Sequence, residues 1–191
     1  MTGDLADARM YYEKASSLYR NAGAEFDAFS MLINFADVSW ALGDLDAAMA
    51  VYLQLVATLR KLPANRERYL GMVLTYLAGV LTERGRFDEA LAAAREGLPL
   101  AKDHGNRWIV FDLLALRAAL AGKIANTARM AGFVDSTFAA KQASRPPNEA
   151  RARNRLQVLL REALTLDEVE RLLAEGAKMN EDEAYRLALE E

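Results

Sequence analysis

The chain has 191 residues, of which 52% are hydrophobic, and this is enough apolar surface to bury a core and to exclude a disordered chain. Its 24 basic and 27 acidic residues give a net charge of -3, which excludes a strong overall attraction to nucleic acid or to an anionic membrane. The sequence lacks cysteine and any apolar run of about 18 residues, and the segment after Met1 is acidic and polar. We therefore expect a cytoplasmic protein without disulfides or thiolate metal sites and without a membrane partner.

Helical periodicity runs through most of the chain. A first helix is expected from Asp4 to about Asn21, with Gly23 ending it. Three helical hairpins are expected to follow, each with a glycine at its turn. They cover 25–62 around Gly43, 66–104 around Gly85, and 106–141 around Gly122.

The hairpins are repeats of one unit. The segment Gly43-Asp44-Leu45-Asp46-Ala47-Ala48 is echoed 40 residues upstream, from Gly3, and 42 residues downstream, from Gly85. Small residues near each turn would let neighbouring helix axes approach to the short end of a range of about 8–10 Å. The equivalent positions are Ala36, Ala78 and Ala115 before the glycine, then Ala8, Ala48, Ala90 and Thr127, and then Tyr12, Tyr52, Ala94 and Ala131 after it.

This pattern of small and aromatic residues around a mid-repeat glycine resembles the tetratricopeptide repeat family. The resemblance covers residues 1–141, about three and a half units, and implies an all-α, right-handed superhelix of antiparallel helix pairs that binds proteins without catalysis. The first helix has no partner before it. We therefore expect either that the chain is the C-terminal piece of a longer protein or that a second copy covers this helix in a homodimer.

The composition changes after the repeats. Residues 142–149 are expected to form a linker because they contain two prolines, and 150–191 are expected to form a cap of three shorter helices. These are predicted at about 149–164, 167–175 and 181–189. Thr165 with Glu168 and Asn180 with Glu183 have the spacing of capping boxes.

The tail also resembles the end of large bacterial regulators, in which a winged-helix or nucleotide-cyclase domain precedes an ATPase and a repeat array. This resemblance implies a regulatory fragment of such a signalling protein. The residues that carry it are Arg151, Leu156, Leu159-Leu160, Leu172, Glu175-Gly176, Asp182-Glu183-Ala184 and Leu187-Ala188-Leu189.

Residues suited to catalysis are scarce. The single histidine, His104, is expected to cap a helix, and a zinc site is disfavoured because no second histidine or cysteine accompanies it. The acidic pairs Asp44 with Asp46, Asp167 with Glu168, and Asp182 with Glu183 all fall in first helical turns, where negative charge is stabilising. We expect no catalytic residues, no cofactor and no metal, and hence no enzyme.

Basic residues concentrate between Lys141 and Arg161, where six of them accompany only one acidic residue, Glu149. They could form an anion or nucleic-acid patch, or they could be solvated or paired with the acidic helices that follow. The second interpretation is favoured because no aromatic residue is interleaved to stack on bases. No direct contact with nucleic acid is expected.

The inner face of the array is the expected binding surface, for a protein, a peptide or a second copy of the chain. Trp40 and Met72 are the best anchors, because large or adaptable apolar side chains dominate such interfaces, although each of them taken alone is more often a core residue than a contact residue. The alternative is a small-ligand sensor with a pocket between array and tail. The predicted protein-binding stripe, on the first helix of each pair, is Ser30, Ile33, Asp37, Trp40, Met72, Thr75, Thr82, Ile109, Asp112 and Leu116.

Overall fold

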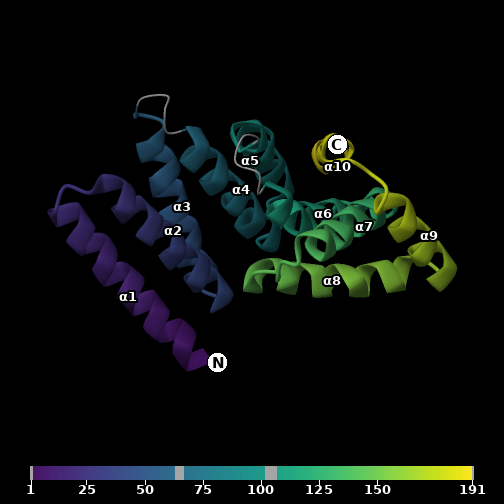
Figure 1. The fold of residues 1–191 in the computed structure, drawn as a ribbon, viewed down its shortest axis with the longest axis horizontal. Helices are drawn as coiled ribbons and strands as arrows, with labels where there is room; N and C mark the ends of the chain where they lie inside the picture. The colour runs from purple at the N-terminus through teal and green to yellow at the C-terminus, as the bar shows by residue number, and fades with distance from the viewer. Residues whose placement is uncertain (1, 63–66, 102–106, 191) are drawn as a thin grey trace.

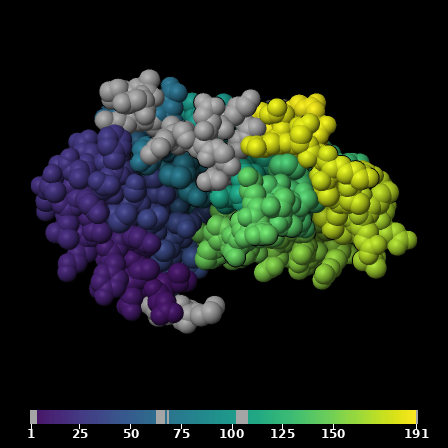
Figure 2. Space-filling view, viewed as in Figure 1, coloured from purple at the N-terminus to yellow at the C-terminus, as the bar shows by residue number. Residues whose placement is uncertain are grey.

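The computed structural model describes residues 2–62, 67–101 and 107–190. All the regular structure in these ranges is helical, and the helices stack side by side from one end of the molecule to the other (Figure 1). With all atoms drawn, the first three helices gather at one end and the last helices at the opposite end (Figure 2). The prediction of an all-α helical-repeat fold is confirmed.

In the described ranges, the array has seven α-helices and a short 3-10 segment. Its helices are α1 (Thr2–Asn21), α2 (Glu25–Ala41), α3 (Leu45–Leu59), α4 (Glu67–Glu83), α5 (Phe87–Leu100), η3 (Arg107–Val110), α6 (Phe111–Leu120) and α7 (Ile124–Lys141). The described bounds agree closely with those expected from periodicity. Two differences are that the sixth helix begins with the 3-10 segment and that α1 already includes Gly3, so the first echo of the turn motif is not itself a turn.

The turn glycines have the role predicted for them. Gly43, Gly85 and Gly122 have φ angles of 87°, 73° and 84°, a conformation that side chains with a Cβ rarely adopt. The small residues near these turns are buried in the helix contacts. Ala36, Ala48, Ala78, Ala90, Ala94, Ala115, Thr127 and Ala131 are all 0% exposed.

The tail forms three helices, α8 (Pro147–Ala163), α9 (Leu166–Gly176) and α10 (Glu181–Leu189). Helix α8 begins at Pro147, inside the expected linker, because proline is tolerated in the first helical turn. Both predicted capping boxes, at Thr165 and Asn180, are confirmed.

The three tail helices surround the α6–α7 pair instead of forming a separate cap. Helix α8 packs on α6, α9 packs on α7, and α10 packs on α5, α6 and α7, whereas α8 and α9 have little contact with each other (Figure 1). Arg117 of α6 donates to the carbonyl oxygens of Ala188 and Glu190 at the end of α10. The tail thus has the three helices predicted from the sequence, and each of them packs on the array.

Candidate protein-interaction face

The inner face of the array carries the chain's own helix α8 over part of its length. Asn148, in the first turn of α8, donates from Nδ2 to Oδ1 of Asp37 at 2.6 Å and to the carbonyl oxygen of Asp37 at 3.1 Å. Asn148 is 0% exposed, so both hydrogen bonds lie away from water. Asp37, one of the predicted binding residues, thus already binds a helix.

Arg151 extends this attachment to the ends of α2 and α4. Its Nη2 donates to the carbonyl oxygen of Trp40 at 3.3 Å and to Oε1 of Glu83 at 3.1 Å, and its Nη1 donates to the carbonyl oxygen of Ala41 at 3.4 Å. A cation at the C-terminus of α2 satisfies carbonyl oxygens that have no partner within the helix. The first turn of α8 is therefore bound by charge and by main-chain hydrogen bonds together.

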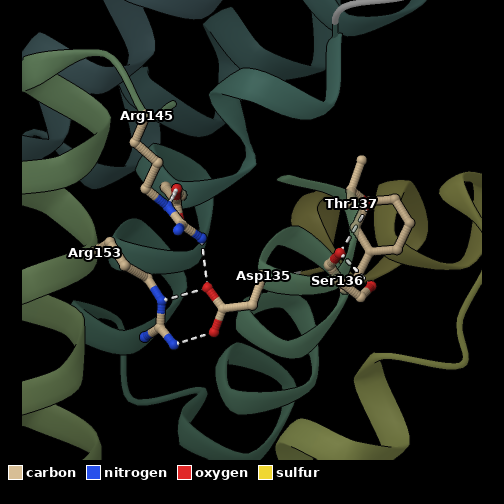
Figure 3. A network of polar contacts seen from close by, with 7 residues as sticks. Asp135, Ser136, Thr137, Arg145 and Arg153 are labelled. Atoms are coloured by element: carbon tan, nitrogen blue, oxygen red, sulfur yellow. Dashed lines mark hydrogen bonds and ion pairs between the residues drawn. The ribbon is translucent and has the colours of Figure 1, made fainter. Parts of the chain in front are cut away.

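A second polar network attaches α8 to α6 and α7. Arg145 donates from Nε to Oδ2 of Asp112 at 2.7 Å and pairs with Asp135, and Arg153 donates from Nε to Oδ1 of Asp135 at 3.1 Å. Figure 3 shows the two arginines converging on the carboxylate of Asp135. The basic residues were expected to be solvated or paired with the acidic helices that follow. The structure corrects the partner: Arg145, Arg151 and Arg153 pair with acidic residues of the preceding array.

Two buried carboxyl groups lie in the same region. Glu149 of α8 is 1% exposed, and burial, reinforced by the negative charges of Asp37 and Asp112, raises its pKa to about 8. Burial likewise raises the pKa of Asp112 to about 6, although its hydrogen bond to Arg145 acts in the opposite direction. Glu149 is therefore mostly neutral at pH 7. A neutral carboxyl group costs less free energy to bury than a charged one.

A half-open cavity of about 250 Å³ lies between α2 and α4. Asp37 joins it to the region covered by α8, because the same side chain lines the cavity and binds Asn148. Burial raises the pKa of Tyr76 on the α4 side, so its hydroxyl stays neutral and is available as a donor. The lining residues are Ser30, Ile33, Asn34, Asp37, Met72 and Tyr76.

The predicted stripe divides into two groups. Ser30, Asp37, Met72 and Ile109 are half-buried, and all but Ile109 line this cavity together with the buried Ile33. The expectation of exposure is wrong for the remaining positions. Ile33, Trp40, Thr75, Thr82, Asp112 and Leu116 are buried at 4% exposure or less.

Trp40 shows why exposure was overestimated. Its indole ring packs into the space left by Gly79, where a Cβ would collide with the ring and lie 2.9 Å from Cδ1 of Leu113. The tryptophan therefore joins α2 to α4 and α6 and is 0% exposed, so it is a core residue in this conformation. A helical stripe in the sequence does not reveal such a packing partner, since Gly79 is 39 positions away.

Two lining residues were missed by the sequence argument. Asn34 and Tyr76 follow Ser30 and Met72 by four positions, which places them on the same sides of α2 and α4. The predicted stripe followed a single line along each helix. Including the residues both three and four positions after each stripe residue would have identified Asn34 and Tyr76.

The acidic residues Asp44 and Asp46, which were considered for catalysis, have structural roles. Asp44 accepts from the backbone N–H of Ala47 at 3.2 Å and pairs with Arg9, while Asp46 pairs with Arg84.

Among the described residues, no three histidine, cysteine, aspartate or glutamate side chains are grouped to hold a metal ion. No helix in the described ranges is both long and apolar enough to cross a membrane. The predicted capping role of His104 lies outside the described residues.

The antiparallel helix pairs and their inner face define a helical-repeat fold. Two models of the tetratricopeptide repeat match the chain, one over residues 29–57 in α2 and α3 and one over residues 70–104 from α4 onward. Both support the tetratricopeptide repeat family, whose members generally bind proteins without catalysis. No curated protein and no solved structure gives a significant match.

Proposed function

We propose that this chain is a non-catalytic interaction module that binds a peptide or helix of a partner protein at the cavity between α2 and α4. The observation that carries the proposal is helix α8, which occupies the neighbouring part of the inner face through Asp37 and the end of α2. In that attachment, a buried amide binds a carboxylate, and a guanidinium binds carbonyl oxygens at the end of a helix. The cavity offers the same carboxylate beside Met72 and Tyr76.

The cavity favours a partner segment with an apolar anchor and a hydrogen-bond donor. Met72 and Ile33 provide an adaptable apolar floor, and Asp37 provides an acceptor at one end. Its volume of about 250 Å³ suits one or two side chains of a peptide. A peptide bound there would lie next to α8 on the inner face of the array.

A random peptide library displayed on phage tests this proposal with the full chain as bait. Selected peptides should bind the wild-type chain at least about tenfold more tightly than the Met72→Glu variant, because a buried charge without a partner is strongly disfavoured. Leu53→Glu is the matched control, since Leu53 is 48% exposed on α3 and does not line the cavity. Peptides that bind both variants equally well would contradict the proposed site.

Self-association through α1 is a second candidate, favoured by exposed apolar side chains on that helix. Tyr11 and Leu18 are seven positions apart, so they lie on one side of the helix, and they are 65% and 62% exposed. Met10 and Tyr19 flank them with exposures of 54% and 40%. Such a row of large apolar residues is typical of a surface that is covered in an assembly.

We further infer that the module is the C-terminal regulatory part of a larger cytoplasmic bacterial regulator with a winged-helix or cyclase domain and an ATPase. The support is the resemblance of the tail, whose residues Leu156, Leu160, Leu172, Ala184 and Ala188 are all buried where α8, α9 and α10 pack. An open reading frame that continues upstream into an ATPase with a phosphate-binding loop would support this context, and an unrelated upstream gene would contradict it.

A further inference from the structure

A second cavity, of about 350 Å³, lies between α8 and α9, away from the protein-binding cavity at α2 and α4. This volume is within the range of about 300–1,000 Å³ that is usual for small-molecule sites. One side is made by three polar residues of α8, Arg153, Gln157 and Arg161, which are spaced four apart and therefore share a helix face. The other side is aliphatic.

Arg153 has one donor nitrogen that the protein does not use. Its side chain is 6% exposed, and its Nε and Nη2 bind the carboxylate of Asp135 on α7. Its Nη1 is buried and has no hydrogen-bond partner in the described structure. Figure 3 shows this third nitrogen pointing away from Asp135. Arg153 also lines the cavity, so its guanidinium keeps a fixed, desolvated donor beside the place where an anion would lie.

The charges around the cavity favour a single negative charge on the ligand. Arg153 and Arg161 contribute two positive charges, and Glu170 of α9 contributes one negative charge. The lining residues thus sum to a charge of +1, and Asp135, which binds Arg153 from outside the lining, reduces this positive charge further, so a single carboxylate is better accommodated than a doubly charged group. A phosphate group, with a charge of about -1.5 to -2 at neutral pH, would be less well balanced.

The remaining lining favours an aliphatic chain. It consists of leucines and a valine without any aromatic ring, namely Leu160, Leu164, Leu166, Val169 and Leu173. Leu166 is 70% exposed, which leaves a large apolar side chain in water at this cavity. An aliphatic chain that lies against Leu166 would remove this surface from water.

We propose that the α8–α9 cavity binds a small monocarboxylate with an aliphatic chain. Its carboxylate accepts hydrogen bonds from Nη1 of Arg153 and from Arg161, and its chain lies against the leucines of α8 and α9. Because Arg153 also binds Asp135, the ligand would be connected to the network that attaches α8 to α6 and α7. The proposal does not depend on peptide binding at α2 and α4.

Calorimetric titration of the full chain with octanoate tests this site. We expect saturable binding of one molecule per chain. Octanol lacks the charge and acetate lacks the chain, so each should bind at least about tenfold more weakly. Equal binding of octanoate and octanol, or no saturable binding of octanoate, would overturn the proposal.

Variants locate the ligand without disturbing the buried network. Arg161→Gln and Leu166→Gln, at exposed positions of the lining, should each weaken octanoate binding several-fold to about tenfold. Arg155→Gln is the matched control, because Arg155 is an exposed arginine of α8 that does not line the cavity, and it should leave binding unchanged. Octanoate binding that is the same in all three variants and the wild type would place the ligand elsewhere and overturn the proposed site. Unchanged selection of peptides by Arg161→Gln would show that the two sites are independent.

Discussion

Gly132 of α7 and Gly176 of α9 mark the point at which these two helices come into backbone contact. A Cβ on Gly132 would lie 2.9 Å from the Cα of Leu173, and a Cβ on Gly176 would lie 2.8 Å from the Cα of Arg129, with the carbonyl oxygens closer still. The neighbouring atoms belong to main chain, so they cannot move aside as a flexible side chain would. The absence of a side chain at Gly132 and Gly176 therefore allows the close crossing of α7 and α9.

We predict that Gly176→Ala separates α9 from α7. The methyl group should cost about 1–3 kcal/mol of unfolding free energy, because the two helices must shift apart to accept it. Urea unfolding followed by tryptophan fluorescence measures this, since Trp108 contacts Phe138 of α7 with ring centroids 4.7 Å apart. Lys178→Ala, an exposed change two positions later, should have little effect. A Gly176→Ala protein as stable as the wild type would contradict a tight crossing.

The attachment of α8 to the inner face can be tested at Asn148. Asn148→Ala removes both hydrogen bonds to Asp37 and leaves a half-buried carboxylate with fewer partners, so we expect a loss of about 1–3 kcal/mol. Hydrogen exchange should become faster in the first turns of α8. Asn154→Ala, at an exposed position of the same helix, is the matched control. Equal exchange in the two variants would show that Asn148 does not hold the helix.

Stability should fall as the pH rises from about 6 to 8. Burial raises the pKa of Glu149 from 4.5 to about 8, so in this interval the folded state keeps a proton that the unfolded state has already lost. The resulting loss is about 2 kcal/mol between pH 6 and pH 8. The pKa of Asp112 is raised to about 6, so its contribution of the same sign lies mainly below pH 6.

Urea unfolding at a series of pH values measures this effect. Glu149→Gln should remove most of the fall between pH 6 and 8, because glutamine occupies the same space without titrating. Glu162→Gln, an exposed glutamate of α8, should retain the wild-type slope. A wild-type slope in the Glu149→Gln protein would assign the titration to another group.

Self-association through α1 predicts a change in mass with a single substitution. If Tyr11 and Leu18 face a second copy, Leu18→Glu should convert a dimer to a monomer in light scattering, because the charge would be buried without a partner. Leu53→Glu, at a leucine of α3 that is 48% exposed, controls for the loss of an exposed apolar residue. A wild-type chain that is monomeric at high concentration would exclude this interface.

Much of the array was predictable from the sequence because its determinants are local. The glycine at each turn, the small residues spaced around it and the capping pairs act within one or two helical turns, and the helix bounds agree with them. The candidate site was predictable only in part. Ser30, Asp37 and Met72 line the cavity as half-buried residues, whereas Trp40 and Leu116 are in the core.

By itself, the sequence determined a stack of antiparallel helix pairs and the positions at which they pack. The tertiary structure decided where the tail lies. Asn148 meets Asp37 across 111 positions and Arg151 meets Glu83 across 68, and both pairs form only when the tail packs on the folded array. Each of these polar contacts occurs only once in the chain, so no repeating pattern in the sequence predicts it. Helix α8 therefore lies on the inner face, and the predicted stripe is partly occupied by the chain itself.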